Sequence, residues 1–416
     1  MRNSFASLRC DEKNPHWKNC VAREHSLYER GNDIRSEFER DYTRLLHSEA
    51  FSRLKHKTQV FFAPQNDHIC TRMEHVLHVA SVASTIAKYL GLNEQLTQAI
   101  AIGHDIGHAP FGHHGENCLN EILSKDETTR KKFWHERNSL FFADFIETLS
   151  NPDGEKVPLN LTYAVRDGLI NHCGEIDQAH IRPREDALDL YSIKKPGIIQ
   201  PYTWEGCVVK IADKIAYLGR DIQDARTYHI LDMTSYRELR EIVATTLGID
   251  KKASHAFRSG KAVNTTVLIN DMIVDLCEQS SPEKGLQFSE EYFRFLIALK
   301  RFSFARIYSH WRIHAFEKYA RQVLETIYTL LMNIHIYAER GRVSQALRNY
   351  KTLRETFEDW LLRYTNYSPA FSHAQKQNRI VFDVADFDSY EKCVIEYISG
   401  MTDVFAIRIY EEIIAF

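Results

Sequence analysis

Paired cysteines, long apolar runs and a strong charge of one sign are all missing from this 416-residue chain. The eight cysteines are scattered without any C-x-x-C pair, which excludes a zinc ribbon, argues against a disulfide framework and suits a reducing compartment. No apolar run approaches membrane-spanning length, and the first residues contain no apolar segment of a signal peptide. We therefore expect a cytoplasmic protein with no membrane partner.

The net charge of −3 is too small for a surface built to coat nucleic acid. One basic cluster stands out, and we interpret it as a solvated loop: Lys251, Lys252, Arg258 and Lys261. Hydrophobic residues make up 44% of the chain and charged residues 26%, which is typical of a globular protein with a sizeable core.

Proline and glycine are also scarce, with 10 and 17 residues, and the alternation typical of strands is rare. Apolar residues recur at helical spacing between residues 75 and 90, and Gly91 stands where such a helix would end. Asn93 is a candidate N-cap for a helix over residues 94–105, and residues 204–225 form a third amphipathic pattern. The sequence predicts an all-α fold.

Proline, glycine and charge cluster without periodicity at residues 151–158 and 183–201, and residues 248–261 form a polar segment. We expect an N-terminal segment over residues 1–44 that is partly ordered, and a helical catalytic core over residues 45–245. A helical C-terminal region over residues 246–416 would pack on that core.

Histidine is concentrated in one part of the chain. Seven of the 20 histidines lie between positions 75 and 135, where even spreading gives about three. Two histidines and two aspartates lie in or beside apolar helical patterns and form a candidate metal site: His75, His104, Asp105 and Asp213. Their nitrogen and oxygen donors suit Mn²⁺, Mg²⁺, Fe²⁺, Co²⁺ or Zn²⁺. Taken singly, each could instead be a satisfied core histidine or a capped aspartate.

These four residues resemble the H…HD…D pattern of the HD phosphohydrolase superfamily. Five strings narrow the resemblance to the deoxynucleoside triphosphate triphosphohydrolases, the dGTPase-like proteins: residues 48–61, HDIGHAPFGHHGE at 104–116, WHE at 134–136, ADKIAYLGRDIQDA at 212–225 and YISGMTD at 397–403. The resemblance implies an HD-domain helical core, a divalent metal ion and hydrolysis of a dNTP to deoxynucleoside and triphosphate. It also implies a homo-oligomer and allows a nucleotide or single-stranded DNA effector.

The resemblance also assigns roles. His113 would protonate the leaving 5′ oxygen, with Glu116 orienting it or a water, while His108 and His135 would face the phosphates. Arg72 and Lys214 would contact phosphate. For both, the alternative is a surface charge or a salt bridge, and we favour the phosphate contact more for Arg72 than for Lys214. The remaining candidates are two pocket-wall residues and three sugar-selecting residues: Arg53, Lys57, Gln59, Tyr217 and Asp221. For Tyr217 the alternative is an aromatic side chain of the core.

Three other functions stay open at this stage. One is an HD phosphohydrolase of another kind, either a nucleotidase or a cyclic-nucleotide phosphodiesterase. Another is a nucleotide-sensing regulatory module with an inactive core, which we would expect to lack a metal ligand. The third, a nuclease for single-stranded DNA, requires a basic channel that the composition does not favour. The preferred base is not encoded in these motifs.

Overall fold

The structure is a computed structural model, and it describes residues 3–27, 33–62, 69–124, 132–173, 177–248, 264–370 and 379–415. The predicted all-α fold is confirmed, because the described strands are two short antiparallel pairs. These are β1 (Thr148–Ser150) with β2 (Lys156–Pro158), and β3 (His180–Ile181) with β4 (Leu286–Gln287). The basic cluster at 251–261 lies outside the described residues.

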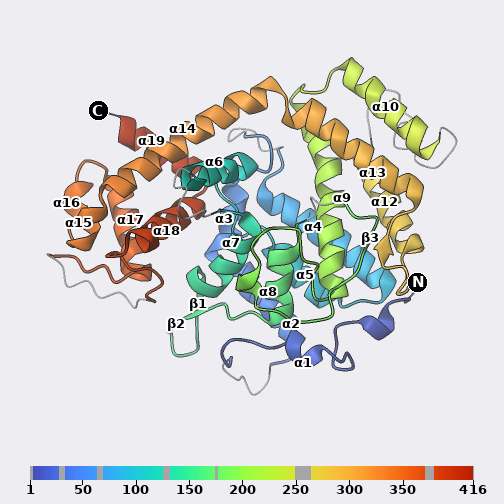
Figure 1. Cartoon of the computed structure of the whole chain (residues 1–416), viewed down its shortest axis with the longest axis horizontal. Coiled ribbons are helices and arrows are strands. Elements are labelled where there is room, and N and C mark those ends of the chain that lie inside the picture. Colours follow the sequence, from blue (N-terminus) through green and yellow to red (C-terminus); the bar gives the residue numbers. More distant parts are fainter. Residues whose placement is uncertain are drawn as a thin grey trace.

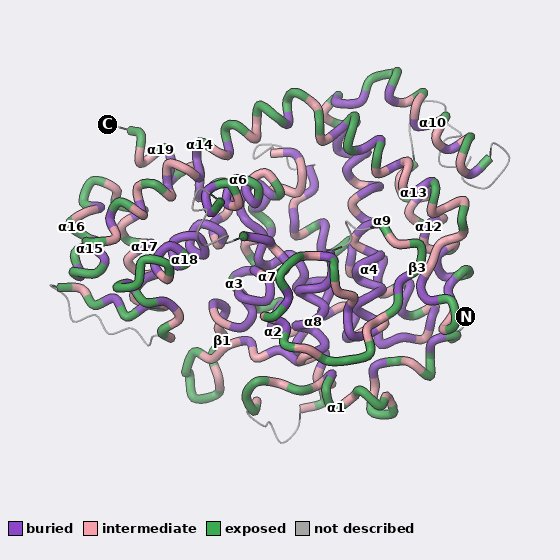
Figure 2. The backbone as a smooth tube through the Cα atoms, in the orientation of Figure 1, coloured by how far each residue is buried: buried purple, intermediate pink, exposed green. Residues whose placement is uncertain are grey.

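The centre of the molecule is a group of buried helices (Figures 1 and 2). α4 (Arg72–Leu90) packs against both α5 (Glu94–Gly103) and α9 (Trp204–Thr227). Surrounding them are α1 (Trp17–Cys20), α2 (Glu37–Leu46), α3 (Glu49–Arg53), α6 (Gly112–Ser124), α7 (His135–Phe141) and α8 (Tyr163–Asn171), with short 3₁₀ turns η1 (Ala6–Leu8), η2 (Leu54–His56) and η4 (Leu190–Ser192) and the π-turn η3 (Phe142–Ile146).

Local capping explains where the central helices begin and end. Thr71 and Glu74 form a capping box at the start of α4, and Gly91 ends that helix with a left-handed φ of 85°. The predicted N-cap Asn93 is confirmed, since its side chain accepts hydrogen bonds from the amides of Gln95 and Leu96.

The second half of the chain adds further helices. α10 (Met233–Leu247) packs on α13 (Glu290–Ser303). α14 (Trp311–Asn333) lies along α6 and reaches α18 (Phe387–Ser399) and α19 (Asp403–Ile414) (Figure 1). The others are α12 (Thr265–Gln279), the π-turn η5 (Phe304–Tyr308), α15 (His335–Glu339), α16 (Val343–Ala346) and α17 (Lys351–Tyr364). One cluster of buried apolar residues extends from Phe5 to Tyr410.

All eight cysteines are buried. Among the described helices, none combines the length and the apolar character that crossing a membrane requires.

Candidate metal centre and catalytic histidines

The candidate metal residues converge where α4, α5 and α9 meet. Nε2 of His75 on α4 lies 3.0 Å from Oδ1 of Asp213 on α9, and Nε2 of His104 lies 4.0 Å from the same oxygen. One donor atom from each of these three residues falls within 4.8 Å of the others. His75 and His104 are buried.

The hydrogen bonding of His104 leaves a nitrogen free to bind a cation. Its Nδ1 lies 2.6 Å from the carbonyl oxygen of Ala101, which can only accept, so Nδ1 carries the proton and Nε2 carries the lone pair. Nε2 is buried and has no hydrogen-bond partner among the described residues. A buried lone pair beside carboxylates is the environment that a metal-ligating imidazole requires, so these residues fit a divalent ion.

Asp105 joins this group from a turn rather than from a helix. We expected the helix to run through Asp105, which is wrong, because α5 ends at Gly103. Oδ1 of Asp105 lies 3.7 Å from Nε2 of His104, and Oδ2 accepts a 2.6 Å bond from Nη1 of Arg72. Adjacent positions on a helix diverge by about 100°, yet Asp105 and His104 both reach the same polar centre.

The charge on both aspartates is stabilised locally. Burial would raise the pKa of Asp105, but the Arg72 guanidinium and neighbouring imidazoles hold it well below its ordinary value. Burial would likewise raise the pKa of Asp213, but the hydrogen bond and charge of His75 lower it to about 2. Both carboxylates are therefore anionic at neutral pH, as metal ligands must be.

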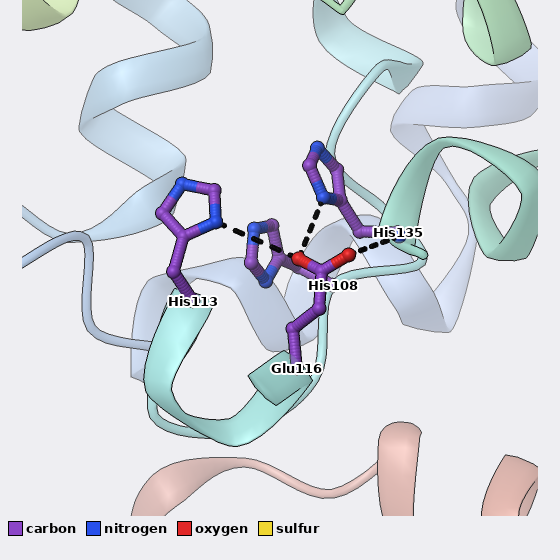
Figure 3. A group of neighbouring side chains, drawn as sticks. All are labelled: His108, His113, Glu116 and His135. Carbon is purple, nitrogen blue, oxygen red and sulfur yellow. Dashed lines mark hydrogen bonds and ion pairs between the residues drawn. The ribbon is translucent and has the colours of Figure 1, made fainter. Parts of the chain in front are cut away.

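A second cluster lies beside the first and consists of His108, His113, Glu116 and His135 (Figure 3). The carboxylate of Glu116 lies between two imidazoles, 2.9 Å from Nδ1 of His135 and 3.5 Å from Nδ1 of His113. It also accepts a 3.0 Å bond from the backbone amide of His135. Glu116 is therefore bound more closely to His135 than to His113, although the sequence spacing pairs it with His113.

The electrostatics of this cluster favour a cationic His135. Burial would lower its pKa, but the carboxylates of Glu136 and Glu116 raise it to about 10. Burial would raise the pKa of Glu116, but the charge of His135 and hydrogen bonds from His113 and His135 hold it well below its ordinary value. Burial and the charge of Arg72 lower the pKa of His108, so this ring stays neutral while it stacks on His135 at 4.3 Å.

The predicted cations have different surroundings. Arg72 is 1% exposed, and its Nε and Nη2 find no acceptor among the described residues, which leaves donors for an anion. Nζ of Lys214 lies 2.9 Å from Asp177, which corresponds to the salt-bridge alternative. Arg53 donates to the carboxylate of Glu147 at 2.8 Å.

The predicted sugar-selecting residues lie in and near α9. Oδ2 of the buried Asp221 accepts a 2.5 Å hydrogen bond from the hydroxyl of Tyr308 in η5, and burial raises the pKa of Asp221 to about 7. Tyr217 precedes Asp221 by one helical turn and is partly buried. Oε1 of Gln59 is buried and has no partner among the described residues.

Sequence reasoning missed His172 and Tyr308. It assigned no role to Glu136, although the string WHE contains that residue. His172 follows α8, and its Nδ1 lies 2.7 Å from the carbonyl of Leu169, in the same i to i−3 arrangement as His104. Its ring lies 4.8 Å from that of His104. A histidine directly after an apolar helical segment is the one available signal in the sequence, and such a histidine is common in ordinary cores.

Comparisons with known proteins agree with this geometry. Residues 72–218 match the HD domain family, and residues 286–412 match the phosphohydrolase-associated domain family. A deoxyguanosinetriphosphate triphosphohydrolase-like protein of Caldanaerobacter subterraneus is 32% identical over 92% of this chain and 86% of its own length. A protein of the same name from Desulfatibacillum aliphaticivorans is 34% identical over 91% of this chain and 88% of its own length. One from Clostridium tetani is 42% identical over 48% of this chain and 49% of its own length.

The residues of the HD pattern thus meet in one polar centre, and two relatives match nearly the whole chain at 32% and 34% identity. The chain belongs to the deoxyguanosinetriphosphate triphosphohydrolase-like family of HD-domain phosphohydrolases.

Proposed function

We propose that this chain hydrolyses deoxynucleoside triphosphates to deoxynucleoside and inorganic triphosphate. The observation that carries the proposal is the adjacency of two clusters: a candidate metal site at His75, His104 and Asp213, and an acid–base group at His113, Glu116 and His135. Asp105 joins them, since its Oδ1 lies 3.7 Å from Nε2 of His104 and 3.9 Å from Nε2 of His135.

The bond changes follow from that adjacency. Water adds to the α-phosphorus, the bond from phosphorus to the 5′ oxygen breaks, and a proton reaches the departing oxygen. A divalent ion bound by the four HD-pattern residues would activate the water and polarise the phosphoryl oxygen. The protein supplies positioning, charge neutralisation and the proton, which dominate catalysis in phosphoryl transfer.

His113 is the proton donor that this arrangement favours. Its side chain is 55% exposed, so a substrate can reach it, and Nδ1 faces Glu116 at 3.5 Å. Glu116 orients the imidazole and, through its closer bond to His135, keeps a cation beside the phosphates. A general acid in this position accounts for a rate factor on the order of 10²–10⁴.

The substrate's charge has matching partners. The Nε and Nη2 donors of Arg72 are buried and without acceptors among the described residues, and the α-phosphate supplies acceptor oxygens. The sugar would lie against Tyr217 and Asp221, where the hydroxyl of Tyr308 holds the carboxylate. Tyr217 would exclude a 2′-hydroxyl by occupying its space.

Product analysis tests this reaction directly. The full chain, loaded with Mn²⁺, is incubated with each dNTP and rNTP, and triphosphate and nucleoside are separated by ion exchange and reversed-phase chromatography. We expect both products in equal amounts from dNTPs and little from rNTPs. Release of pyrophosphate, of single phosphates or of a nucleoside monophosphate instead would refute the proposal.

A pair of histidine variants tests the proton donor. His113→Ala should retain divalent-ion binding and lose most of the rate. His78→Ala is the matched control, because His78 lies on α4 one turn beyond His75 and is exposed. Equal rates in the two variants would exclude His113 as the acid.

A further inference from the structure

The turn immediately before His113 has a strained backbone. Between the turn after α5 and the start of α6, Phe111 has a φ of 64° and Gly112 a φ of 61°. Gly112 can adopt this left-handed conformation freely, but Phe111 cannot. Such a conformation in a bulky residue persists only where neighbouring groups hold it in place.

The group that holds Phe111 comes from the far end of the sequence. Oδ1 of Asp403, the first residue of α19, accepts a 2.8 Å hydrogen bond from the backbone amide of Phe111. Oδ2 accepts a 2.8 Å bond from the backbone amide of Thr58. Asp403 is 2% exposed, so neither bond competes with bulk water.

A buried lysine makes a second connection between the same two parts of the chain. Nζ of Lys57 donates to the carbonyl oxygen of His108 and, at 2.8 Å, to that of Ser399 at the end of α18. Nδ2 of Asn138 bonds to the carbonyl of Gly107 at 2.7 Å and to Oγ of Ser399 at 3.1 Å. Residues 107, 108 and 111 are thus each tied to the junction of α18 and α19.

Apolar packing reinforces these bonds. The Phe111 ring is 1% exposed and contacts Phe316 on α14 edge to face, with ring centres 5.8 Å apart. The same ring contacts Phe62 at 6.1 Å, and Phe62 stacks on Phe316 at 5.0 Å. The second half of the chain therefore contacts both the backbone and the side chain of this turn.

We propose that Asp403 is a positioning residue for catalysis: from α19 it holds the Phe111 backbone in its left-handed conformation and so aims His113 and Glu116 at the reacting phosphate. This inference rests on the proposed function for its catalytic consequence. It assigns a function to the junction of α18 and α19, which holds the turn that precedes His113.

Asp403→Asn is the variant that tests this role. Asparagine keeps one acceptor oxygen and presents an amide that cannot accept, so one of the two backbone amides loses its partner. We expect kcat for dNTP hydrolysis to fall on the order of 10²-fold, because small misplacements of reacting groups have effects of that size. KM and divalent-ion affinity should change little, since Asp403 contacts neither cluster directly.

Two further measurements separate positioning from general stability. Hydrogen exchange at the Phe111 amide should accelerate in Asp403→Asn, and this measurement needs no turnover, so it stands even if dNTPs are not substrates. In a His113→Ala background, Asp403→Asn should lower the rate little further, because the two residues act through one step. Multiplicative rate losses, or unchanged Phe111 exchange, would overturn the proposal.

Thr402→Ala is the matched control. Thr402 caps α19 by accepting a hydrogen bond from the amide of Phe405, and it makes no bond to residues 107–112 that the structure records. The substitution therefore weakens the same helix without releasing the turn at Phe111. It should leave kcat and Phe111 exchange as in the wild type, and equal losses in both variants would refute the positioning role. If Asp403→Asn does not fold, Lys57→Met tests the same connection, because Lys57 joins the carbonyl of His108 to that of Ser399. We expect the same loss of kcat and an unchanged affinity for the divalent ion.

Discussion

Replacing Gly107 with alanine should move a catalytic element without touching any titratable group. A Cβ at this position would lie 2.0 Å from the backbone nitrogen of Ser139 and 2.2 Å from the carbonyl carbon of Asn138, both in α7. Backbone atoms cannot rotate away as side-chain ends can. To restore an ordinary 3.4 Å contact, α7 must withdraw by about 1.4 Å.

That movement carries His135, the first residue of α7, away from Glu116 and Asp105. We expect a rate loss on the order of 10²-fold, since a displacement near 1 Å has that effect. Overpacking should also reduce the free energy of unfolding by about 1–3 kcal/mol. Triphosphate release and urea unfolding of the same preparation measure the two effects.

Gly219→Ala is the control for the added methyl group. Its Cβ would lie 2.8 Å from Cδ1 of Ile269, which is the end of a flexible side chain. The gain in helix propensity, near 1 kcal/mol, offsets the local crowding, so activity should persist. If Gly107→Ala turned over dNTPs at the wild-type rate, the link between α7 position and catalysis would be wrong.

Three other predictions follow from single residues. Asp213→Ala should abolish both divalent-ion binding in calorimetry and turnover, and a chelator should lower the Tm of the wild type but not of this variant. Burial raises the pKa of Glu396 from 4.5 to about 7, so the native state loses stability as the pH rises from 4.5 to 7. Relative to the wild type, Glu396→Gln should therefore gain about 3 kcal/mol more in its free energy of unfolding in urea near pH 8 than near pH 4. Arg166→Met leaves the buried Asp144 without its 2.6 Å partner and should reduce the unfolding free energy by about 3–5 kcal/mol, whereas no loss would indicate that Tyr191 suffices.

Helix type and many helix ends could be predicted from local signals. Gly91 and Asn93 act through hydrogen bonds to residues a few positions away, so their effect is visible in the sequence. The end of α5 at Gly103 was not visible, because the apolar pattern continues through it. The break at Gly400 between α18 and α19 was also missed, and it places Asp403 at a helix start.

The candidate site likewise contains residues that the sequence could identify and residues that only the structure could identify. The metal residues could be named from residue type and from the family strings, and the structure brings all four together. Their catalytic roles stay predictions. His172 and Tyr308 belong to no recognised string, and only the packing of α8 and η5 places them beside His104 and Asp221.

The sequence by itself determined the helical class, the capped ends of the central helices and the identity of the candidate metal ligands. Periodicity and capping act within a few residues, so they can be read along the chain. The four metal residues lie far apart in the sequence and were grouped by residue type and by the family resemblance. Only the tertiary structure decided which partner each polar group takes: His135 for Glu116, Asp177 for Lys214. It also brought Asp403 to Phe111, 292 positions away, because a hydrogen bond depends on tenths of an ångström that only helix packing sets.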